Sequence, residues 1–254
     1  MPAITDTLVN RPVWFDFSTG NLDAAKALYG ELFGWTFEDS GEAFGHYNMA
    51  FRNGQPVAAV MPKMPGSDGM PSAWTVYMGV ANVDATAAAI TANGGQVIVP
   101  PMDVPGSGRM AIATDKGGAH FGLWQAGPFP GARLEGEHGS MCWAEAASRD
   151  MENAAFYEKV FGLTAHKMEG AHVYWTLHQP SDNAAVAGVM HMDASFGDVP
   201  PHWLAYFAVE NLDEANAIWK KHGGKVLQGP IPSPYGKIMI VQDAEGAALA
   251  YMAA

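Results

Sequence analysis

The sequence predicts an α+β protein of two tandem domains, each built from two strand–helix–strand–strand–strand units. The first observation behind this prediction is that the chain repeats itself: residues 74–95 read WTVYMGVANVDATAAAITANGG, and residues 203–224 read WLAYFAVENLDEANAIWKKHGG. The segments that begin at Trp14 and Trp143 match in the same way. The copies lie about 129 residues apart, which is the size of a domain and too long for a solenoid repeat.

The boundary between the two copies falls in a segment rich in glycine and proline. Residues 127–140 read GPFPGARLEGEHGS, and stretches of this composition connect structured units. We therefore expect a first domain over residues 1–126, a linker over residues 127–140 and a second domain over residues 141–254.

The second observation is a strand followed by an amphipathic helix at the start of each unit. In the first unit the apolar stretch 13–17 contains Asp16, and Asn21 is a typical helix N-cap. Apolar residues then recur at the three- and four-residue spacing of one helical face: Leu22, Ala25, Leu28, Tyr29, Leu32 and Phe33. Gly34 is expected to end this helix.

The unit that begins at Trp203 follows the same plan. A β-rich run over residues 203–209 precedes Asn211, and Glu214 stands at the capping-box position three residues later. A Gly-Gly pair ends the helix. Each such pair is followed by a strand, a turn, and two strands joined by an Asp-to-Gly turn at residues 115–118 or 243–246. The whole chain is therefore predicted to hold four units.

The composition excludes several classes of function. With 14 Lys and Arg against 26 Asp and Glu, the net charge of −12 repels polyanions, so we expect no nucleic-acid partner. The N-terminal residues lack the features of a secretory signal, and no apolar run approaches the ~20 residues that cross a bilayer, so we expect no membrane partner. A single cysteine, Cys142, excludes an internal disulfide, and the expected location is the reducing cytoplasm.

Six phrases carry a resemblance to the vicinal oxygen chelate superfamily, which includes glyoxalase I, extradiol dioxygenases, fosfomycin-resistance enzymes and bleomycin-binding proteins. They are NLDAAKALYGELFGW (21–35), NVDATAAAITANGG (82–95), DKGGAHFGLWQ (115–125), DMENAAFYEKVFGL (150–163), NLDEANAIWKKHGG (211–224) and DAEGAALAYM (243–252). The resemblance covers nearly all of the chain outside the linker and is strongest to tandem, two-domain glyoxalase-like proteins. It implies that each pair of βαβββ units forms a cupped mixed sheet around a cavity.

The resemblance also implies where a divalent metal would be held. Family members with chemistry use His or Glu on the first strand of each unit and Glu on closing strands, and an open coordination position polarises a substrate oxygen. In this chain those positions fall on Trp14, Thr75 and Gly122 in the first half, and on Trp143 (or Cys142), Leu204 and Ala250 in the second. These side chains, Cys142 apart, do not ligate a hard divalent ion in the usual way. We therefore expect the usual metal site to be absent and predict no cofactor.

A divalent metal in a displaced position is the alternative. Side chains two apart on a strand share a face, and Asp16 and His120 each stand two residues from an expected ligand position of the first half. Glu145 is the second-half counterpart of Asp16, but Ala248 replaces His120. A carboxylate and one imidazole are few ligands for a metal. The competing interpretation is that Asp16 and Glu145 are hydrogen-bonded strand residues and that His120 belongs to a turn.

Aromatic residues stand in and near the expected metal positions. The predicted ligand-binding set combines rings with one carboxylate in each half: Trp14, Asp16, Trp74 and Tyr77, then Trp143, Glu145, Trp203 and Tyr206. A flat apolar wall with a carboxylate suits a planar organic ligand. The competing interpretation is that these rings belong to the core, where aromatic residues bury large areas.

Three functions are therefore weighed. The favoured one is a protein that binds a small aromatic or hydroxylated compound in cupped cavities, with the usual metal-ligand positions lost. The second is an enzyme, either a metal-dependent lyase or dioxygenase-like protein with a displaced metal near Asp16 and His120, or one whose general base and catalytic residue is Asp16 or Glu145. The third is a structural or regulatory protein with filled cavities. The tandem halves predict a monomer with paired domains or a homodimer.

Overall fold

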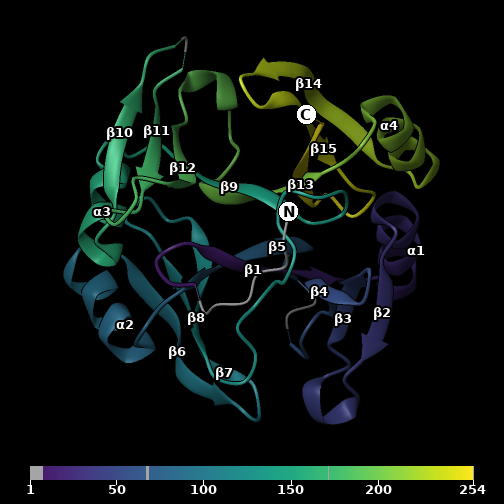
Figure 1. Ribbon diagram of the computed structural model, residues 1–254, viewed down its shortest axis with the longest axis horizontal. Helices are drawn as coiled ribbons and strands as arrows, with labels where there is room; N and C mark the ends of the chain where they lie inside the picture. Colours follow the sequence, from purple (N-terminus) through teal and green to yellow (C-terminus); the bar gives the residue numbers. More distant parts are fainter. Residues whose placement is uncertain (1–7, 67–68, 171, 254) are drawn as a thin grey trace.

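The two halves of the sequence fold alike in a computed structural model that describes residues 8–66, 69–170 and 172–253 (Figure 1). The elements of the first half are β1 (Pro12–Thr19), α1 (Leu22–Phe33), β2 (Thr36–Asp39), the short helix η1 (Glu42–Phe44), β3 (Asn48–Arg52), β4 (Gln55–Pro62), β5 (Ala73–Gly79), α2 (Val83–Ala92), β6 (Gln96–Val104), β7 (Gly108–Thr114) and β8 (His120–Ala126). The elements of the second half are β9 (Met141–Ser148), α3 (Asn153–Phe161), β10 (Thr164–Met168), β11 (Tyr174–His178), β12 (Ala185–His191), the short helix η2 (Ala194–Phe196), β13 (His202–Ala208), α4 (Leu212–Lys221), β14 (Lys225–Ser233), β15 (Gly236–Gln242) and β16 (Ala248–Ala253).

Each half forms one mixed sheet of eight strands. The strand order is β2-β3-β4-β1-β5-β8-β7-β6 in the first sheet and β10-β11-β12-β9-β13-β16-β15-β14 in the second. Within each sheet the two βαβββ units meet at their first strands, because β1 pairs antiparallel with β5 and β9 with β13. The predicted fold class, α+β with tandem domains of paired βαβββ units, is confirmed.

The helix ends follow the signals in the sequence. The Asn21 side chain accepts a hydrogen bond from the Ala24 N–H, and Gly34 ends α1 in the left-handed conformation with φ +67°. Asn211 caps α4 by accepting from the N–H groups of Asp213 and Glu214. Among the helices that the structure describes, none combines the length and apolarity needed to cross a bilayer.

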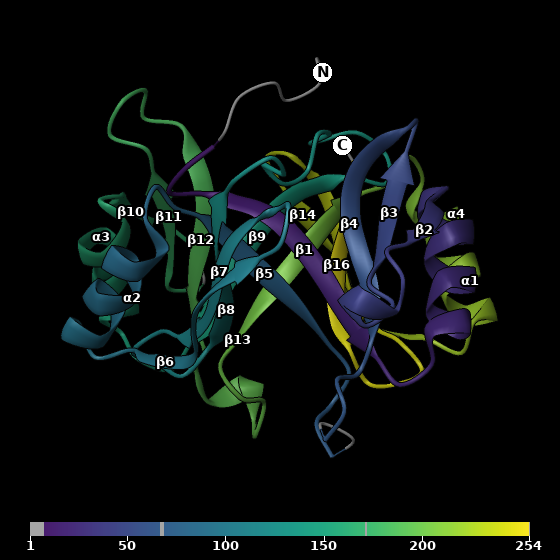
Figure 2. The same ribbon diagram turned by 90° about the horizontal axis from the view of Figure 1, so that it is seen from below.

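The main hydrophobic core lies between the two sheets and joins the halves. Helix α1 packs beside α4 on one flank and α2 beside α3 on the other (Figures 1 and 2). Phe207 of the second half packs against first-half rings, with centroid distances of 5.4 Å to Phe15 and 5.1 Å to Trp74. We call the side of each sheet that faces this core its core face, and the opposite side its cup face.

Two hairpin turns lock the halves together in a reciprocal way. Asp115, in the turn between β7 and β8, accepts hydrogen bonds from Asn153 Nδ2 (2.8 Å) and Tyr157 Oη (2.7 Å) of α3. In the other direction, Glu245 between β15 and β16 accepts from the Gly20 N–H (3.0 Å) just before α1. Each half therefore binds the helix start of the other through a turn carboxylate. Burial raises the pKa of Asp115, against the opposing effect of its hydrogen bonds.

The hydroxyl of Tyr157 yields a first test of this interface. It also accepts the indole N–H of Trp203 (3.0 Å), so Tyr157→Phe leaves a buried donor and a buried carboxylate short of partners. We expect a loss of about 2 to 3 kcal/mol in the free energy of unfolding, measured by urea denaturation. Tyr235→Phe is the control because Tyr235 is 76% exposed, and a loss no larger than that of the control would contradict the interface described here.

Candidate functional site

Strand alternation places one carboxylate on the cup face of the first sheet. Phe15 and Phe17 on β1 enter the core. Trp14 and Asp16 alternate with them along the strand and therefore point to the cup face. Asp16 is only 2% exposed. The register places Thr75 of β5 directly beside it.

Two tyrosines and a tryptophan surround this carboxylate. The Tyr47 hydroxyl donates to Asp16 Oδ2 (3.2 Å) and accepts the indole N–H of Trp14 (2.7 Å). Burial raises the pKa of Asp16 to about 6, and the neighbouring hydroxyls of Tyr77, Tyr47 and Thr75 oppose that rise. The other carboxylate oxygen, Oδ1, is buried and finds no hydrogen-bond partner in the described part of the protein. An orphaned buried acceptor of this kind is costly, and it identifies a position where a ligand donor would be favourable.

The second sheet repeats the cluster with a longer acid. Glu145 of β9 is 5% exposed, and the Trp143 indole N–H donates to the Tyr174 hydroxyl (2.9 Å). Burial raises the pKa of Glu145, while hydrogen bonds from Tyr206 and Tyr174 act in the opposite direction. Each cup face therefore carries the same four-part cluster, one tryptophan, one carboxylic acid and two tyrosines.

Glycines make room for these tyrosines. A Cβ on Gly122 of β8 would overlap the ring of Tyr77, and a Cβ on Gly188 of β12 would overlap the Tyr174 hydroxyl. Tyr77 and Gly122 are direct partners in the parallel pair β5–β8. The Tyr77 ring thus covers the position where the resemblance expects a metal-binding side chain on the closing strand.

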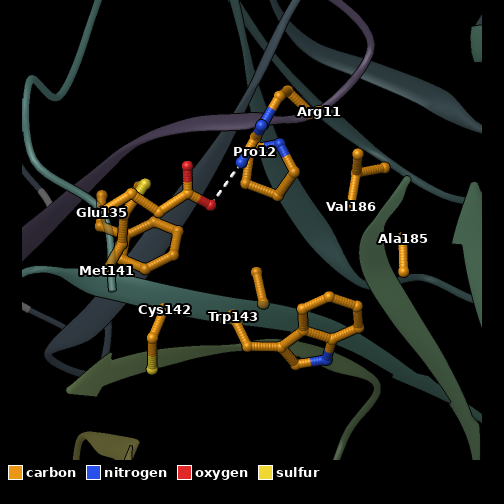
Figure 3. Close-up of a pocket in the computed structure, with 10 residues that line it drawn as sticks. Arg11, Pro12, Glu135, Met141, Cys142, Trp143, Ala185 and Val186 are labelled. Carbon is orange, nitrogen blue, oxygen red and sulfur yellow. Dashed lines mark hydrogen bonds and ion pairs between the residues drawn. The ribbon is translucent and has the colours of Figure 1, made fainter. Parts of the chain in front are cut away.

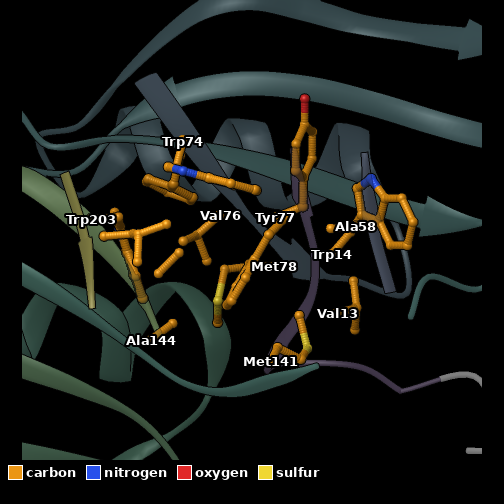
Figure 4. Packing of buried hydrophobic residues seen from close by; sticks show 14 of the residues in the cluster. Val13, Trp14, Ala58, Trp74, Val76, Tyr77, Met78, Met141, Ala144 and Trp203 are labelled. Atoms are coloured by element: carbon orange, nitrogen blue, oxygen red, sulfur yellow. The ribbon is translucent and has the colours of Figure 1, made fainter. Parts of the chain in front are cut away.

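The structure brings together six of the predicted site residues and separates two. Trp14, Asp16 and Tyr77 share the first cluster, as Trp143, Glu145 and Tyr206 share the second. Trp74 and Trp203 require a correction: they lie in the core between the halves and donate to Tyr29 (3.2 Å) and Tyr157 (3.0 Å). The physical reason is strand alternation, since residues 74 and 77 are three apart and point to opposite faces (Figure 4).

The donor set does not fit the metal of the family. The expected positions of the first half hold Trp14, Thr75 and Gly122, which offer neither a carboxylate nor an imidazole. For the displaced alternative, Asp16 is buried whereas His120 is exposed at the start of β8. The described ranges contain no group of three or more His, Cys, Asp or Glu side chains arranged to hold a metal. Metal binding through Asp16 and His120 stays a prediction.

Sequence reasoning missed the second tyrosine of each cluster. Tyr47 directly precedes β3, and Tyr174 begins β11. Each of these strands lies two positions away in the sheet from the strand that carries the carboxylic acid. The internal repeat held a usable signal, because GHYNMAF at 45–51 and AHVYWTL at 171–177 both place a tyrosine shortly after a histidine. Cys142, the ligand considered at a slipped register, has its pKa raised by burial to about 12, which keeps the thiol protonated.

Comparison with known proteins identifies the family. A sequence model of the Glyoxalase/Bleomycin resistance protein/Dioxygenase superfamily matches residues 11–123 and again residues 143–251. The chain belongs to this superfamily. One relative, CFP32 of Mycobacterium tuberculosis, provisionally named a glyoxylase, is 38% identical over 252 residues that cover 97% of this chain and 96% of the relative. DnrV of Streptomyces peucetius, named an anthracycline biosynthesis protein, is 34% identical over 252 residues that cover 93% and 90% of the two chains.

Solved structures of superfamily members share the fold. The Mn(II)-bound glyoxalase from Novosphingobium aromaticivorans aligns with a TM-score of 0.67 over 96% of this chain and 82% of that chain, at 16% identity. The 2,2',3-trihydroxybiphenyl 1,2-dioxygenase from Sphingomonas wittichii strain RW1 aligns with a TM-score of 0.65 over 97% and 91%, at 14% identity. At such identities the likeness concerns the fold and leaves the chemistry to the side chains of this chain.

The raised pKa of Asp16 predicts a specific pH dependence. Because the folded-state pKa of about 6 exceeds the ordinary value of 3.8, the native state binds this proton more tightly than the unfolded chain does. Its stabilising contribution is complete below pH ~4 and is lost as the pH rises through 6. Relative to wild type, Asp16→Asn should therefore gain about 2.4 kcal/mol in unfolding free energy between pH 4 and pH 7.5.

Urea denaturation of both proteins across this range provides the measurement. The readout is the difference in unfolding free energy between the two proteins, so the contributions of titrating groups that both contain cancel. Glu145→Gln should change in the same direction, because burial raises that pKa as well. A difference that stays constant with pH would mean that Asp16 is ionised in the folded protein throughout.

Proposed function

We propose that this superfamily member binds a small aromatic or hydroxylated organic compound on its cup faces without the usual metal-ligand positions. The observation that supports this most is the cluster of one tryptophan, one buried acid and two tyrosines on each sheet. Asp16 Oδ1 at its centre is buried and unpartnered among the described residues. Pockets for small molecules are commonly apolar and aromatic, with a few polar groups that fix orientation.

The clusters favour ligands that carry hydrogen-bonding groups. Burial raises the pKa of both Asp16 and Glu145, so each acid is more readily protonated than it would be in water. A protonated carboxylic acid can donate one hydrogen bond and accept another, and a tyrosine hydroxyl can do the same. These groups match the hydroxyl and carbonyl oxygens at the edge of a planar ring system.

The names of two relatives agree with this ligand class. DnrV and DauV, both 34% identical to this chain, are named anthracycline biosynthesis proteins. Anthracyclines are planar, hydroxylated polycyclic compounds, so a ligand of that general shape is a reasonable choice for a first test.

A second candidate function is an enzyme in which Asp16 transfers a proton. The pKa of about 6 and the free Oδ1 atom favour it, because a general base works best when its pKa lies near the operating pH. In this case Asp16 would act on a compound bound on the first cup face, and Glu145 would act in the same way on the second.

The test uses 1,8-dihydroxyanthraquinone as the probe, with binding followed by calorimetry on metal-stripped protein. We expect saturable binding that EDTA does not abolish. The double variant Tyr77→Phe/Tyr206→Phe should bind about tenfold more weakly, because each cup face loses a hydroxyl next to its acid. Tyr235→Phe, at an exposed position, should bind like wild type.

Three outcomes separate the candidates. No saturable binding up to the solubility limit of the probe, or a double variant that binds like wild type, contradicts the proposal. Binding that requires an added divalent metal supports a displaced metal site instead. Conversion of the probe that disappears in Asp16→Asn, while its binding persists, supports the enzyme.

A further inference from the structure

We infer that the ligand binds on the cup face of the second half, against Trp143, and that the linker ring of Phe129 fills the matching place in the first half. This inference rests on the proposed function and assigns it to one of two related sites. It starts from a difference between the halves, since two copies of one domain should otherwise offer two equal cups.

The first cup is covered by the chain itself. The Phe129 ring packs edge-on against Trp14 with a centroid distance of 4.9 Å and against Trp124 at 6.0 Å. The Trp124 indole N–H donates to the Phe129 carbonyl (2.8 Å), which fixes the segment in place. Trp14 is consequently only 4% exposed.

The residues after Phe129 continue this cover along the edge of the cup. The Ala132 N–H donates to the Val13 carbonyl (2.8 Å), and the Arg133 N–H donates to the Pro56 carbonyl (2.8 Å). The linker thus lies in a slot between the starts of β1 and β4, and it holds an aromatic ring against the tryptophan.

The corresponding slot in the second half is open. The repeat offset of 129 residues matches Val13 to Cys142 and Pro56 to Ala185. Both counterparts line a cavity of about 100 Å³, together with Trp143 and Val186 (Figure 3). Within residues 8–66, 69–170 and 172–253, no aromatic ring packs on Trp143.

Cys142 and Trp143, which line this cavity, also pack against a small apolar cluster of the second half. Leu204, Tyr206 and Ala250 form a small cluster apart from the central core, and Ile238 and Ile240 pack on it while staying partly exposed. In the first half the counterparts Met110 and Ile112 are also partly exposed, but they pack against the larger cluster that includes Trp14 and Tyr77. The second cup therefore offers apolar area that a ligand can remove from water.

The polar groups of the cavity indicate the ligand chemistry. Arg11 forms an ion pair with Glu135, which leaves the pair without net charge, and Arg11 Nε is buried with no hydrogen-bond partner among the described residues. This donor suits a neutral acceptor, such as a carbonyl or phenol oxygen, better than a carboxylate. The cavity volume is of the order needed by a single six-membered ring. The predicted ligand is a planar aromatic compound whose terminal, oxygen-bearing ring enters beside Trp143 while its other rings cover Ile238 and Ile240.

The experiment compares matched positions of the two cups with 1,8-dihydroxyanthraquinone as the probe. Ile240→Trp narrows the second cup, and Ile112→Trp makes the same change at the counterpart position of the first. We expect one site per chain in wild type, at least tenfold weaker binding in Ile240→Trp and less than a twofold change in Ile112→Trp. Ala248→Phe and His120→Phe form a second matched pair if a tryptophan variant fails to fold.

Phe129→Ala tests the role of the linker ring. Its removal exposes Trp14, so the number of probe sites measured by calorimetry should rise from one to two per chain. Weaker binding in Ile112→Trp with unchanged binding in Ile240→Trp would overturn the inference and leave the proposed function standing. An unchanged stoichiometry in folded Phe129→Ala would overturn the role given to Phe129. Failure of wild type to bind the probe at all would remove the proposed function and the inference together.

Discussion

The shared core between the two sheets is the constraint on which the other features depend. Because both sheets bury their core faces against each other, every strand must send alternate side chains into that core and the rest to the cup face. Phe15 and Phe17 enter the core, while Trp14 and Asp16, which alternate with them along β1, face the cup. A carboxylate on a strand this well packed cannot reach bulk water, so its neighbours must supply hydroxyl groups.

Hydroxyl groups, and no cationic side chain among the described residues, are what the electrostatics identify around the buried acids of this chain. In a metal centre, charged ligands are balanced by the cation. Here the acids are held by tyrosines, and the Tyr77 ring lies over Gly122, where no side chain can stand. The chain shares its fold with an Mn(II)-bound glyoxalase, and in this chain the sheet carries a hydrogen-bonding acid in an aromatic setting. The fold therefore allows both kinds of site, and the identity of a few side chains selects between them.

The parts of the site that could be predicted from sequence are those that local periodicity determines. Trp14 and Asp16 are two residues apart, so their common face follows from one strand, and the repeat transfers the same reasoning to Trp143 and Glu145. Trp74 and Tyr77 do not belong to one site, because their spacing of three places them on opposite faces of the strand. Tyr47 and Tyr174 depend on the strand order of the sheet, which no local pattern encodes. The part played by Phe129 depends on how a glycine-rich segment folds back, and such segments lack periodicity.

The linker has a further consequence for a chain made of two copies. A tandem duplication produces two domains but only one connection between them, so the copies cannot have identical surroundings. Phe129 is tethered on both sides next to Trp14, and short tethers give effective concentrations in the millimolar range. Under the proposed function, a free ligand would compete with this intramolecular ring in the first cup and mainly with water in the second. The two cups therefore have different surroundings because of chain connectivity alone, even without any sequence difference between the halves.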